Sequence, residues 1–414
     1  MSDLEQWYSN VLQLAKRWKK WSRWGKYGTV AIFFAAGIIA FTIMQLSGQT
    51  ISSDGDSIVF LITAILIGAV PLFISYVVFS VFISGAQLSL KNALIDYNRS
   101  IQQYCIEDKL TRQGVRHAHF RRADGIWPSD VVRSGLIQKK YLDKIQTDSY
   151  VEGVLSGQKF RFSFLNVKVF FTEEFLNEIH NGRTEDGWAR RLFSQRIETS
   201  KEQTTQNEYF NGQFWALQSN RQFPCRVLYL NNAMKRLMSN TRRTELWCIS
   251  DGAFEPVEIH DPFLMKEGIC LCDDRDLAEE VLTDELKAKI REYGETHPDE
   301  AFFMSFVNRE IFFFDYSEDG NRFMNEGGLF VHTKENMISD ACRQMKSMAE
   351  TSCKTGTGIS KYLFEIMEIF QDEGVMWSSG GEEPAEGEID QQMKVVNQQL
   401  LELQSYCGSR STIR

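Results

Sequence analysis

The sequence has few of the residues and motifs on which catalysis and metal binding usually depend. Four of its 6 histidines are scattered, and the pair His117 and His119 does not by itself indicate a metal site. None of its 8 cysteines stands in a CxxC pair or at zinc-knuckle spacing. The phosphate-binding loop GxxxxGKS/T, the zinc motif HExxH and the nucleophile motif GxSxG are missing as well. We therefore predict no catalytic, cofactor-binding or metal-binding residue, and we interpret the cysteines as reduced structural thiols.

Positive net charge is also absent. The chain carries 46 Lys and Arg residues against 55 Asp and Glu residues, which gives a formal net charge of −9. Domains that bind nucleic acids usually present a basic face to the phosphate backbone. We therefore expect no nucleic-acid partner.

Two long stretches lack charge altogether. Residues Thr29–Leu46 and Ile58–Ile83 contain no Asp, Glu, Lys or Arg. As helices they would be about 27 Å and about 39 Å long at about 1.5 Å per residue, which is the scale of a hydrocarbon core. The two runs predict a two-helix transmembrane hairpin over residues 28–84. A buried hydrophobic hairpin in a soluble core is the alternative.

The flanks of the two runs predict their orientation. The connecting loop, Ser47–Ser57, has no Lys or Arg and contains Asp54 and Asp56, whereas both outer flanks are rich in cations. Because the cytoplasmic flanks of membrane helices are enriched in Lys and Arg, both termini should lie in the cytoplasm. We predict a multi-pass protein of the bacterial inner (plasma) membrane, with the lipid bilayer as one of its partners.

Residues 1–27 contain four tryptophans interleaved with cations. Indole rings favour the headgroup region and cations favour anionic lipid, so we predict an amphipathic helix that lies along the inner leaflet. Packing of this helix against the chain's own stalk is the alternative. Basic residues that follow the second run are expected to meet headgroups too. The predicted membrane-interface residues are Trp18, Lys19, Lys20, Trp21, Arg23, Trp24, Arg121 and Arg122.

A helical stalk is predicted after the second run, over residues 85–122. Its apolar residues recur at alternating steps of four and three, which is typical of a helix face that packs against another helix. The partner of this face would be the N-terminal helix, the soluble domain or a second subunit. The residues of the face are Leu90, Leu94, Tyr97, Ile101 and Tyr104.

Residues 123–332 are expected to form an α+β cytoplasmic domain built around an antiparallel sheet. Several runs alternate between apolar and polar residues, as half-buried strands do. Within residues 159–171 the apolar positions slip by one residue, which predicts a β-bulge, and Asn308-Arg309 predicts a hairpin turn. The predicted strands are Tyr150–Leu155, Lys159–Phe171, Tyr209–Leu217, Cys225–Leu230, Glu245–Ile249, Gly268–Cys272, Ala301–Val307 and Glu310–Tyr316.

Helices are predicted inside and after this domain. One should cover Asp276–Tyr293 and end at Gly294. Residues 333–376 should form two helices, Lys334–Glu350 and Ile359–Gln371, with a glycine-rich loop at Gly356–Lys361 where the second helix starts. Residues 377–414 should form an acidic linker with a terminal helix. The acidic residues expected to cap the first helix, in preference to binding a cation, are Asp273, Asp274 and Asp276.

Spaced hydrophobic, glycine and aspartate positions in four stretches carry a resemblance to a known family. The stretches are Asp148–Phe164, Phe210–Phe214, Gly268–Leu286 and Phe302–Phe314. In them the chain resembles the bacterial membrane family catalogued as domain of unknown function 3137, whose members are often encoded beside LemA-type membrane proteins. The resemblance covers residues 120–330 and the preceding hairpin, and Cys272-Asp273 stands where the family commonly has a Tyr-Ser pair. It implies a membrane location and an α+β fold, and no chemistry.

Two functional hypotheses follow from the sequence. The first is an inner-membrane scaffold or sensor without enzymatic activity, whose cytoplasmic domain binds a protein partner or a second copy of the chain. The membrane tether, the heptad-like stalk and the missing catalytic motifs motivate it. The alternative is a membrane-surface enzyme or ligand-gated effector that acts on a lipid or a small molecule, motivated by the basic, aromatic N-terminal helix.

Overall fold

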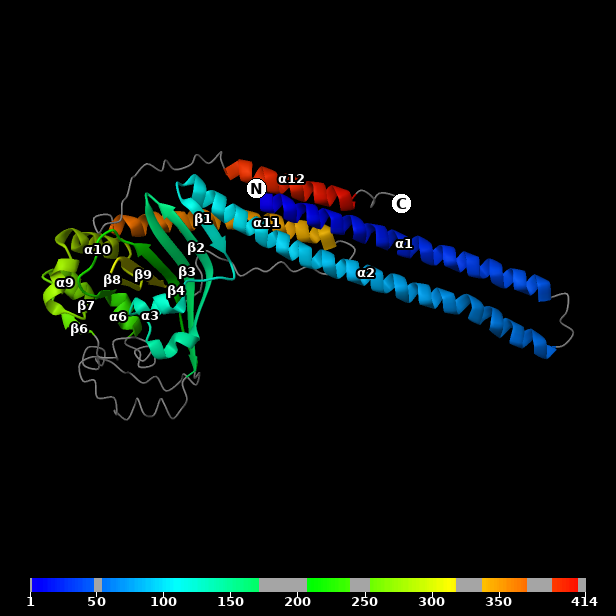
Figure 1. The fold of residues 1–414 in the computed structure, drawn as a ribbon, viewed down its shortest axis with the longest axis horizontal. Helices are drawn as coiled ribbons and strands as arrows, with labels where there is room; N and C mark the ends of the chain where they lie inside the picture. The colour runs from blue at the N-terminus through cyan, green and yellow to red at the C-terminus, as the bar shows by residue number, and fades with distance from the viewer. Residues whose placement is uncertain are drawn as a thin grey trace. The chain divides into compact units, whose positions relative to one another are not determined.

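A computed structural model of the chain describes residues 2–47, 54–170, 207–238, 254–317, 337–370 and 389–408. The chain divides into two compact units (Figure 1). The helical unit comprises residues 1–104, 327–350 and 389–414, and the sheet unit comprises residues 105–326 and 351–388. The strand predicted at Glu245–Ile249 and the acidic linker at residues 377–388 lie outside the described residues.

The helical unit is built from long helices. They are α1 (Ser2–Ser47), most of α2 (Asp54–Arg112), the first part of α11 (Met337–Ile369) and α12 (Ile389–Gly408). α1 is continuous across residue 28 and α2 across residue 85. The boundaries expected between interfacial helix, apolar run and stalk therefore fall inside single helices.

The N-terminal part of α1 packs inside the helical unit. Leu4, Val11 and Ala15 are buried, and the Tyr8 hydroxyl donates to the Glu402 carboxylate of α12 over 2.8 Å. Burial, helped by this hydrogen bond, raises the pKa of Tyr8 to about 12. The N-terminal helix therefore packs within the chain, as in the alternative prediction, although the hydrogen bond shown here is to α12, which is not the stalk named in that prediction.

The predicted stalk face is covered within the same unit. Its first four residues, from Leu90 to Ile101, are buried, and Tyr104 is half-buried. The Tyr97 hydroxyl donates to Gln399 Oε1 of α12 over 2.7 Å. Helices of this chain therefore cover at least part of the face.

The stalk ends earlier than predicted. α2 ends at Arg112, and residues Arg116–Arg121 form β1, the edge strand that pairs with β2 (Ile145–Leu155). Gly114, at φ 89°, adopts the left-handed conformation that lets the chain turn between helix and strand. The prediction of helix to residue 122 is wrong, because strand pairing gives the backbone of β1 its partners.

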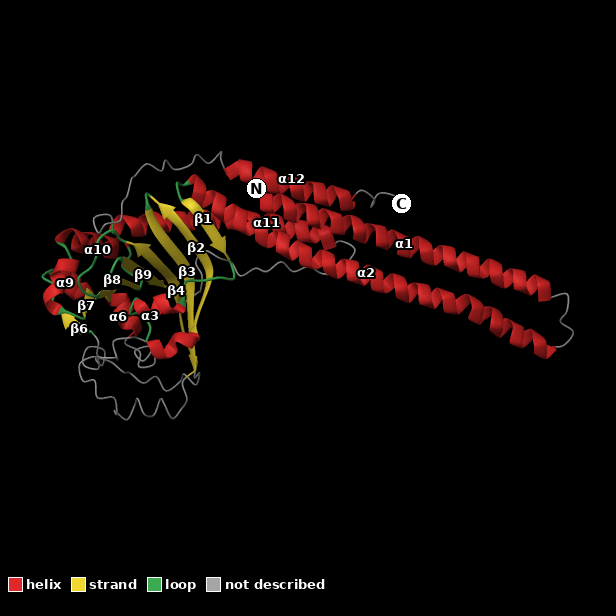
Figure 2. Ribbon diagram, in the orientation of Figure 1, coloured by secondary structure: helices red, strands yellow, loops and turns green. Residues whose placement is uncertain are grey.

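Among the described residues, the sheet unit holds one nine-stranded antiparallel sheet in the order β1-β2-β3-β4-β9-β8-β5-β7-β6 (Figure 2). The predicted α+β class with an antiparallel sheet is confirmed. The remaining strands are β3 (Gln158–Phe170), β4 (Asn207–Gln218), β5 (Val227–Asn231), β6 (Glu255–Val257), β7 (Gly268–Cys272), β8 (Phe302–Val307) and β9 (Glu310–Tyr316). The helices of this unit include α3 (Pro128–Arg133), the 3₁₀ helix η1 (Lys139–Lys144), α6 (Asn232–Met238), α8 (Pro262–Glu267), α9 (Arg275–Val281) and α10 (Asp284–Thr296).

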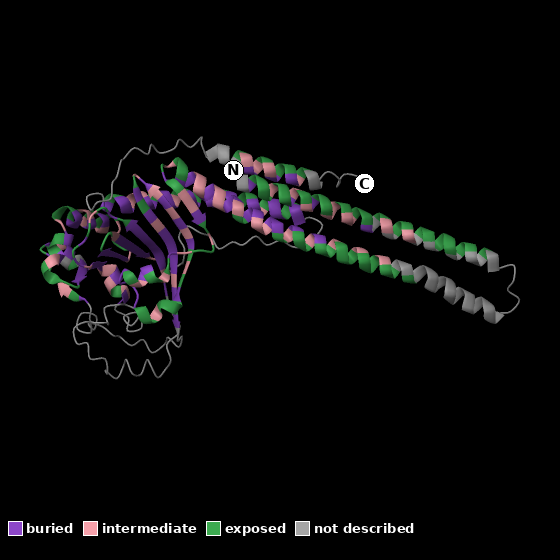
Figure 3. Ribbon diagram, viewed as in Figure 1, coloured by how far each residue is buried: buried purple, intermediate pink, exposed green. Residues whose placement is uncertain are grey.

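Both faces of this sheet are buried (Figure 3). One face packs against α9, α10 and the second part of α11, and the other against α3, η1 and α6. Phe162 of β3 belongs to the first face, and Leu165 and Val167 belong to the second. β3 therefore carries apolar residues at both even and odd positions because both faces of the sheet are buried. The one-residue slip in its apolar pattern does not come from a bulge, so the bulge predicted in β3 is wrong. The register shift lies in β2, between Asp148 and Val151.

The turn between β8 and β9 forms as predicted. Val307 pairs with Glu310, so Asn308 and Arg309 make a two-residue loop. Asn308 has φ 57°, in the left-handed region that asparagine tolerates better than most residues. The backbone N–H of Ser219 donates to the Arg309 carbonyl over 2.8 Å and holds the turn in place.

The helix predicted over Asp276–Tyr293 is two helices. α9 ends at Val281, and the hydroxyl of Thr283 accepts a hydrogen bond from the Leu286 N–H over 3.2 Å as the cap of α10. α10 continues past Gly294, so this glycine does not end it. A threonine followed by acidic residues is an N-cap signal. Thr283 starts a new helix within the stretch whose apolar spacing predicted a single helix.

The two C-terminal helices predicted on either side of Gly356–Lys361 are one helix. α11 runs through this segment without a break. A Cβ at Gly356 would lie 3.0 Å from the Lys109 Cβ and 3.3 Å from the Ile106 Cα of α2. The glycine lets α11 and α2 approach closely, and this packing outweighs the low helix propensity of glycine.

Replacing Gly294 by alanine should stabilise the sheet unit. Apart from its chain neighbours and the backbone of its own helix, no described heavy atom lies within 4 Å of the position that a Cβ would take. Because glycine inside a helix costs about 0.5–1 kcal/mol relative to alanine, we expect a gain of that size in the free energy of unfolding. Denaturant titration of the full-length protein, followed by circular dichroism, measures it. A lowered midpoint would contradict the prediction.

Candidate functional site

Exposed large hydrophobic side chains gather on two helical segments of the described chain, residues 24–41 of α1 and residues 70–88 of α2. Exposed apolar patches of this extent mark a surface that meets a membrane or another protein. Lys and Arg residues precede the α1 segment. The exposed side chains are Trp24, Tyr27, Val30, Phe34, Ile38, Ile39, Phe41, Val70, Phe73, Ile74, Tyr76, Val77, Val78, Val81, Phe82 and Leu88.

One helical segment, Phe73–Arg112, is long and apolar enough to cross a membrane among the residues that the structure describes in full. It overlaps the second predicted run and is compatible with a membrane association. The two-span arrangement and the cytoplasmic location of both termini stay predictions.

The predicted membrane-interface tryptophans lie on two different faces of α1. Trp21 stacks on Phe82 of α2, with ring centroids 4.8 Å apart, and a Cβ at the neighbouring Gly25 would lie 2.7 Å from Ile83 Cδ1. This face therefore packs on α2. Trp24 and Tyr27 are 60% and 69% exposed, so they lie largely outside this contact.

The other predicted interface residues come from both units of the chain. Trp18 and Lys19 are half-buried, and Lys20 and Arg23 are exposed, all on α1. Arg121 belongs to β1 of the sheet unit and pairs with Asp124 over 3.2 Å; Arg122 follows it. The set predicted as one interface thus comes from both units.

A groove of about 850 Å³ lies on the sheet unit, on the face that α3 covers. Strand register builds its floor, because Glu152 of β2 pairs with Arg161 of β3, and Arg161 pairs with Ala216 of β4. The next row contains Gln218 of β4 opposite Glu310 of β9. The groove is lined by His117, Arg133, Glu152, Gly153, Val154, Lys159, Phe160, Arg161, Ala216, Gln218, Gln222, Asn308, Arg309 and Glu310.

Two arginines and two carboxylates form a closed ring beside this groove. Arg161 lies 2.6 Å from Asp130 of α3 and 2.7 Å from Glu310. Arg133 completes the ring, 2.9 Å from Asp130 and 2.5 Å from Glu310. The ring is neutral and links α3 to β3 and β9. Both arginines therefore have a structural role.

Two other cations of the groove, Lys159 and Arg309, form no ion pair with a described residue. His117, held at φ 54°, lines the same groove. The Glu152 carboxylate accepts a hydrogen bond from the Tyr150 hydroxyl over 2.8 Å. The groove can therefore bind a polar ligand that carries an anionic group. The sequence analysis did not predict this groove, although Arg161, which lies between the buried Phe160 and Phe162 of β3, could have indicated it.

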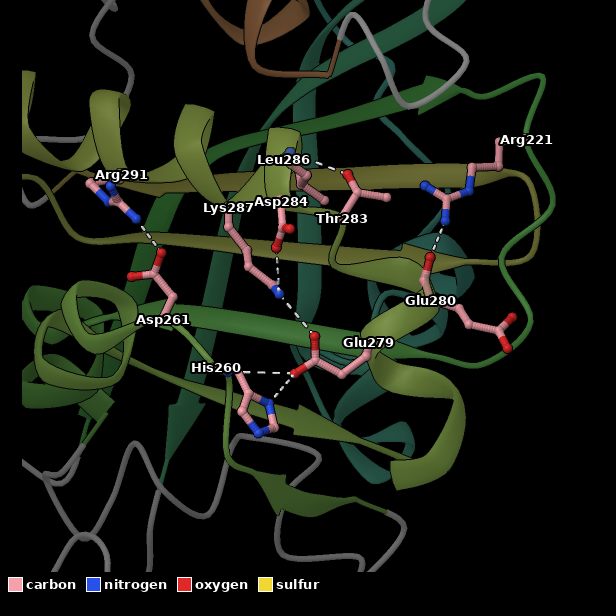
Figure 4. Close-up of polar contacts among 10 residues, drawn as sticks. All are labelled: Arg221, His260, Asp261, Glu279, Glu280, Thr283, Asp284, Leu286, Lys287 and Arg291. Atoms are coloured by element: carbon pink, nitrogen blue, oxygen red, sulfur yellow. Dashed lines mark hydrogen bonds and ion pairs between the residues drawn. The ribbon is translucent and has the colours of Figure 1, made fainter.

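A second polar network holds α8, α9 and α10 together (Figure 4). The ammonium of Lys287, whose side chain is 7% exposed, lies 2.8 Å from Glu279 Oε2 and 3.2 Å from Asp284 Oδ1. His260 Nδ1 lies 3.0 Å from the other oxygen of Glu279. The hydrogen bond from Lys287 lowers the pKa of Glu279 to about 2. Each of these charged groups has a partner inside the network, so the network has a structural role.

Replacing Glu279 by glutamine should make the sheet unit less sensitive to acid. The pKa of Glu279 is about 2 in the folded state, against an ordinary value of 4.5. Its lowered pKa stabilises the fold above pH 4.5, and this contribution is lost as the pH falls from 4.5 to about 2. Because the carboxylate is 40% exposed, solvent screening reduces the effect to about 1 kcal/mol. Thermal unfolding from pH 6 to pH 2.5 measures it; equal slopes for both proteins would contradict it.

Of the acidic trio predicted to cap a helix, Asp274 is the N-cap of α9, Asp276 lies in its first turn, and Asp273 bonds outside the helix. Asp274 Oδ1 accepts from the Asp276 N–H over 3.1 Å at the start of α9, and Asp273 Oδ1 accepts from the Arg226 N–H over 2.8 Å. No group of three or more His, Cys, Asp or Glu side chains in the described residues could hold a metal ion. Six cysteines with described surroundings are buried thiols that form no disulfide among the described residues. Burial raises the pKa of Cys272 to about 11, which keeps that thiol unreactive.

Comparison with known proteins finds no match to a family model, to a curated protein or to a solved structure. The resemblance to the family of unknown function described above stays a prediction. The function is therefore argued from the residues of this chain.

Proposed function

We propose that the chain is a membrane-anchored scaffold or sensor whose sheet unit binds a protein partner on the cytoplasmic side of a bacterial inner membrane. One observation carries the proposal: the exposed large hydrophobic side chains of the described chain concentrate on residues 24–41 and 70–88. An apolar belt on two neighbouring helices fits a bilayer better than water.

The charge distribution supports an orientation for this anchor. Cations from Lys16 to Lys26 precede the apolar part of α1, whereas Asp54 and Asp56 lie at the opposite end of the two apolar runs. The positive-inside rule places the N-terminal end of α1 in the cytoplasm. The sheet unit follows α2 and would lie on the same side if both runs span.

A binding role is supported by the chemistry of the groove in the sheet unit. Its lining contains no Ser, Thr, Cys or Tyr that could act as a nucleophile. It contains the turn at Asn308-Arg309, which the Ser219 N–H holds in place, the exposed Lys159 and the neutral ion-pair ring. These features suit recognition of an acidic segment of a partner.

Brief crosslinking of native membranes, followed by purification in mild detergent, tests this function. We expect a defined complex that contains a second protein or a second copy of the chain. The double substitution Lys159→Gln and Arg309→Gln should release the partner, whereas Lys235→Gln and Arg236→Gln on α6, outside the groove, should not. Recovery of a lone monomer from the membrane would refute the scaffold role.

A ligand-gated effector is the second candidate, favoured by the volume of the groove, about 850 Å³. Cavities of this size hold small molecules. A thermal-shift screen with nucleotides, sugar phosphates and dicarboxylates should use the full-length protein. A fragment that starts near Gly125 would lose β1 and the buried Val115 and Phe120. Stabilisation that disappears in the Lys159→Gln, Arg309→Gln variant would support this candidate; absence of any shift would remove it.

A further inference from the structure

A hollow of about 540 Å³ lies along one exposed face of α1. Its lining residues follow one another at alternating steps of three and one residues, so with 3.6 residues per turn they form a single helical face. The cations Lys16, Lys19, Lys20 and Arg23 come first, followed by Trp24 and Tyr27, and then by Gly28 and Ala31.

The composition of this face changes along the helix axis in a fixed order. Cations occupy residues 16–23, exposed aromatic rings residues 24 and 27, and small residues 28 and 31, beside the exposed Val30 and Phe34. A phospholipid has the same order of groups: an anionic phosphate, a glycerol ester region, and acyl chains. Tryptophan and tyrosine favour the level of the ester region.

The spacing along α1 also fits a lipid. Lys20 and Trp24 are four residues apart, about 6 Å along a helix at about 1.5 Å per residue. The interfacial layer of each leaflet is about 5–8 Å thick, given a core of about 30 Å and a total of about 40–45 Å. A phosphate beside Lys20 and Arg23 would therefore place the first acyl carbons beside Tyr27 and Gly28.

The small residues turn this face into a site instead of a general interface. A bulky side chain at residue 31 would fill the hollow, whereas Ala31 leaves room for an acyl chain. Gly28 lies close to α2, because a Cβ there would be 3.0 Å from the Phe79 ring. Gly28 therefore lines the hollow and also lets α1 approach α2 closely.

We infer that this face of α1 binds one anionic glycerophospholipid, with its phosphate at Lys20 and Arg23, its ester region beside Trp24 and Tyr27, and an acyl chain over Gly28 and Ala31. The inference rests on the proposed membrane insertion. It names a ligand that this insertion alone does not require. Lipid held here would be retained when the surrounding bilayer is exchanged.

Native mass spectrometry of the full-length protein, purified with an equimolar mixture of phosphatidylglycerol and phosphatidylcholine, tests the inference. We expect one phosphatidylglycerol to be retained per chain. Substituting Lys20→Gln and Arg23→Gln should reduce the retained fraction by about tenfold or more, because each surface cation contributes measurably to anionic lipid binding. Substituting Ala31→Leu should reduce it as well by filling the acyl part of the hollow.

The control is Lys346→Gln with Lys394→Gln, two exposed lysines of the helical unit that lie outside the hollow. This variant loses the same charge and should retain the lipid. Inorganic phosphate at millimolar concentration should not displace the lipid; displacement, or full retention by the Ala31→Leu variant, would overturn the acyl-chain assignment. Equal retention of both lipids by the wild-type protein would overturn the site.

Extraction with alkaline carbonate separates failure of this inference from failure of the proposed function. Wild-type protein that stays in the membrane pellet without a lipid preference refutes the lipid site alone. Wild-type protein that leaves the pellet refutes membrane insertion, and the lipid site with it. The charge variants should stay in the pellet, because their apolar segments are intact.

Discussion

Replacing Gly212 by alanine is expected to destabilise the sheet unit by about 3 kcal/mol or more, since overpacking at a rigid backbone contact cannot relax cheaply. A Cβ at this position would lie 2.3 Å from the Asp315 carbonyl oxygen and 2.5 Å from the Phe314 ring. One of these neighbours is backbone of the adjacent strand β9, so no side-chain rotation removes the clash. Strand β4 must then separate from β9 at the centre of the sheet.

Urea titration of the full-length protein, followed by intrinsic tryptophan fluorescence, measures this effect. Trp215 is buried in β4 and contacts Phe162, with ring centroids 4.3 Å apart and ring planes tilted by 40°, so its emission reports on this strand. The matched control is Gly294→Ala, the same change at a site with open space, for which we expect the opposite sign. A Gly212→Ala midpoint equal to that of the wild type would show that the sheet can widen there without cost.

Introducing lysine at Ile38 and Phe41 together is expected to move most of the protein out of the carbonate-resistant membrane fraction. These side chains are 66% and 62% exposed on α1, near the middle of the first apolar run. Each lysine at the centre of a membrane helix costs about 3 kcal/mol on insertion scales. Two such charges would offset most of the insertion energy of a short apolar run.

The control for this prediction places lysine at Trp127 and Leu401. These residues are 74% and 64% exposed, and they lie outside the apolar segments of α1 and α2. If exposure alone decided the outcome, both double variants would behave alike. We expect the control to remain in the membrane. Retention of the Ile38→Lys, Phe41→Lys variant at wild-type levels would mean that this face of α1 does not contact the hydrocarbon core.

The sequence contained the local signals for most of the elements. Two uncharged runs fell inside α1 and α2, and alternation with the turn at Asn308-Arg309 located β3, β4, β5, β7, β8 and β9 to within two residues, and the second half of β2. Local signals suffice here because a helix repeats every 3.6 residues and a strand every 2. The Thr283 cap was present as well, but a longer apolar periodicity concealed it.

Only the tertiary structure decided where these elements meet. Strand order places β9 beside β4, and helices cover both faces of the sheet, so alternation in β3 could not show which face was buried. The ion-pair ring joins Asp130, Arg161 and Glu310 from three separate elements. The continuity of α11 through Gly356 depends on its contact with α2. Such features arise from contacts between residues far apart in the chain, which no local periodicity encodes.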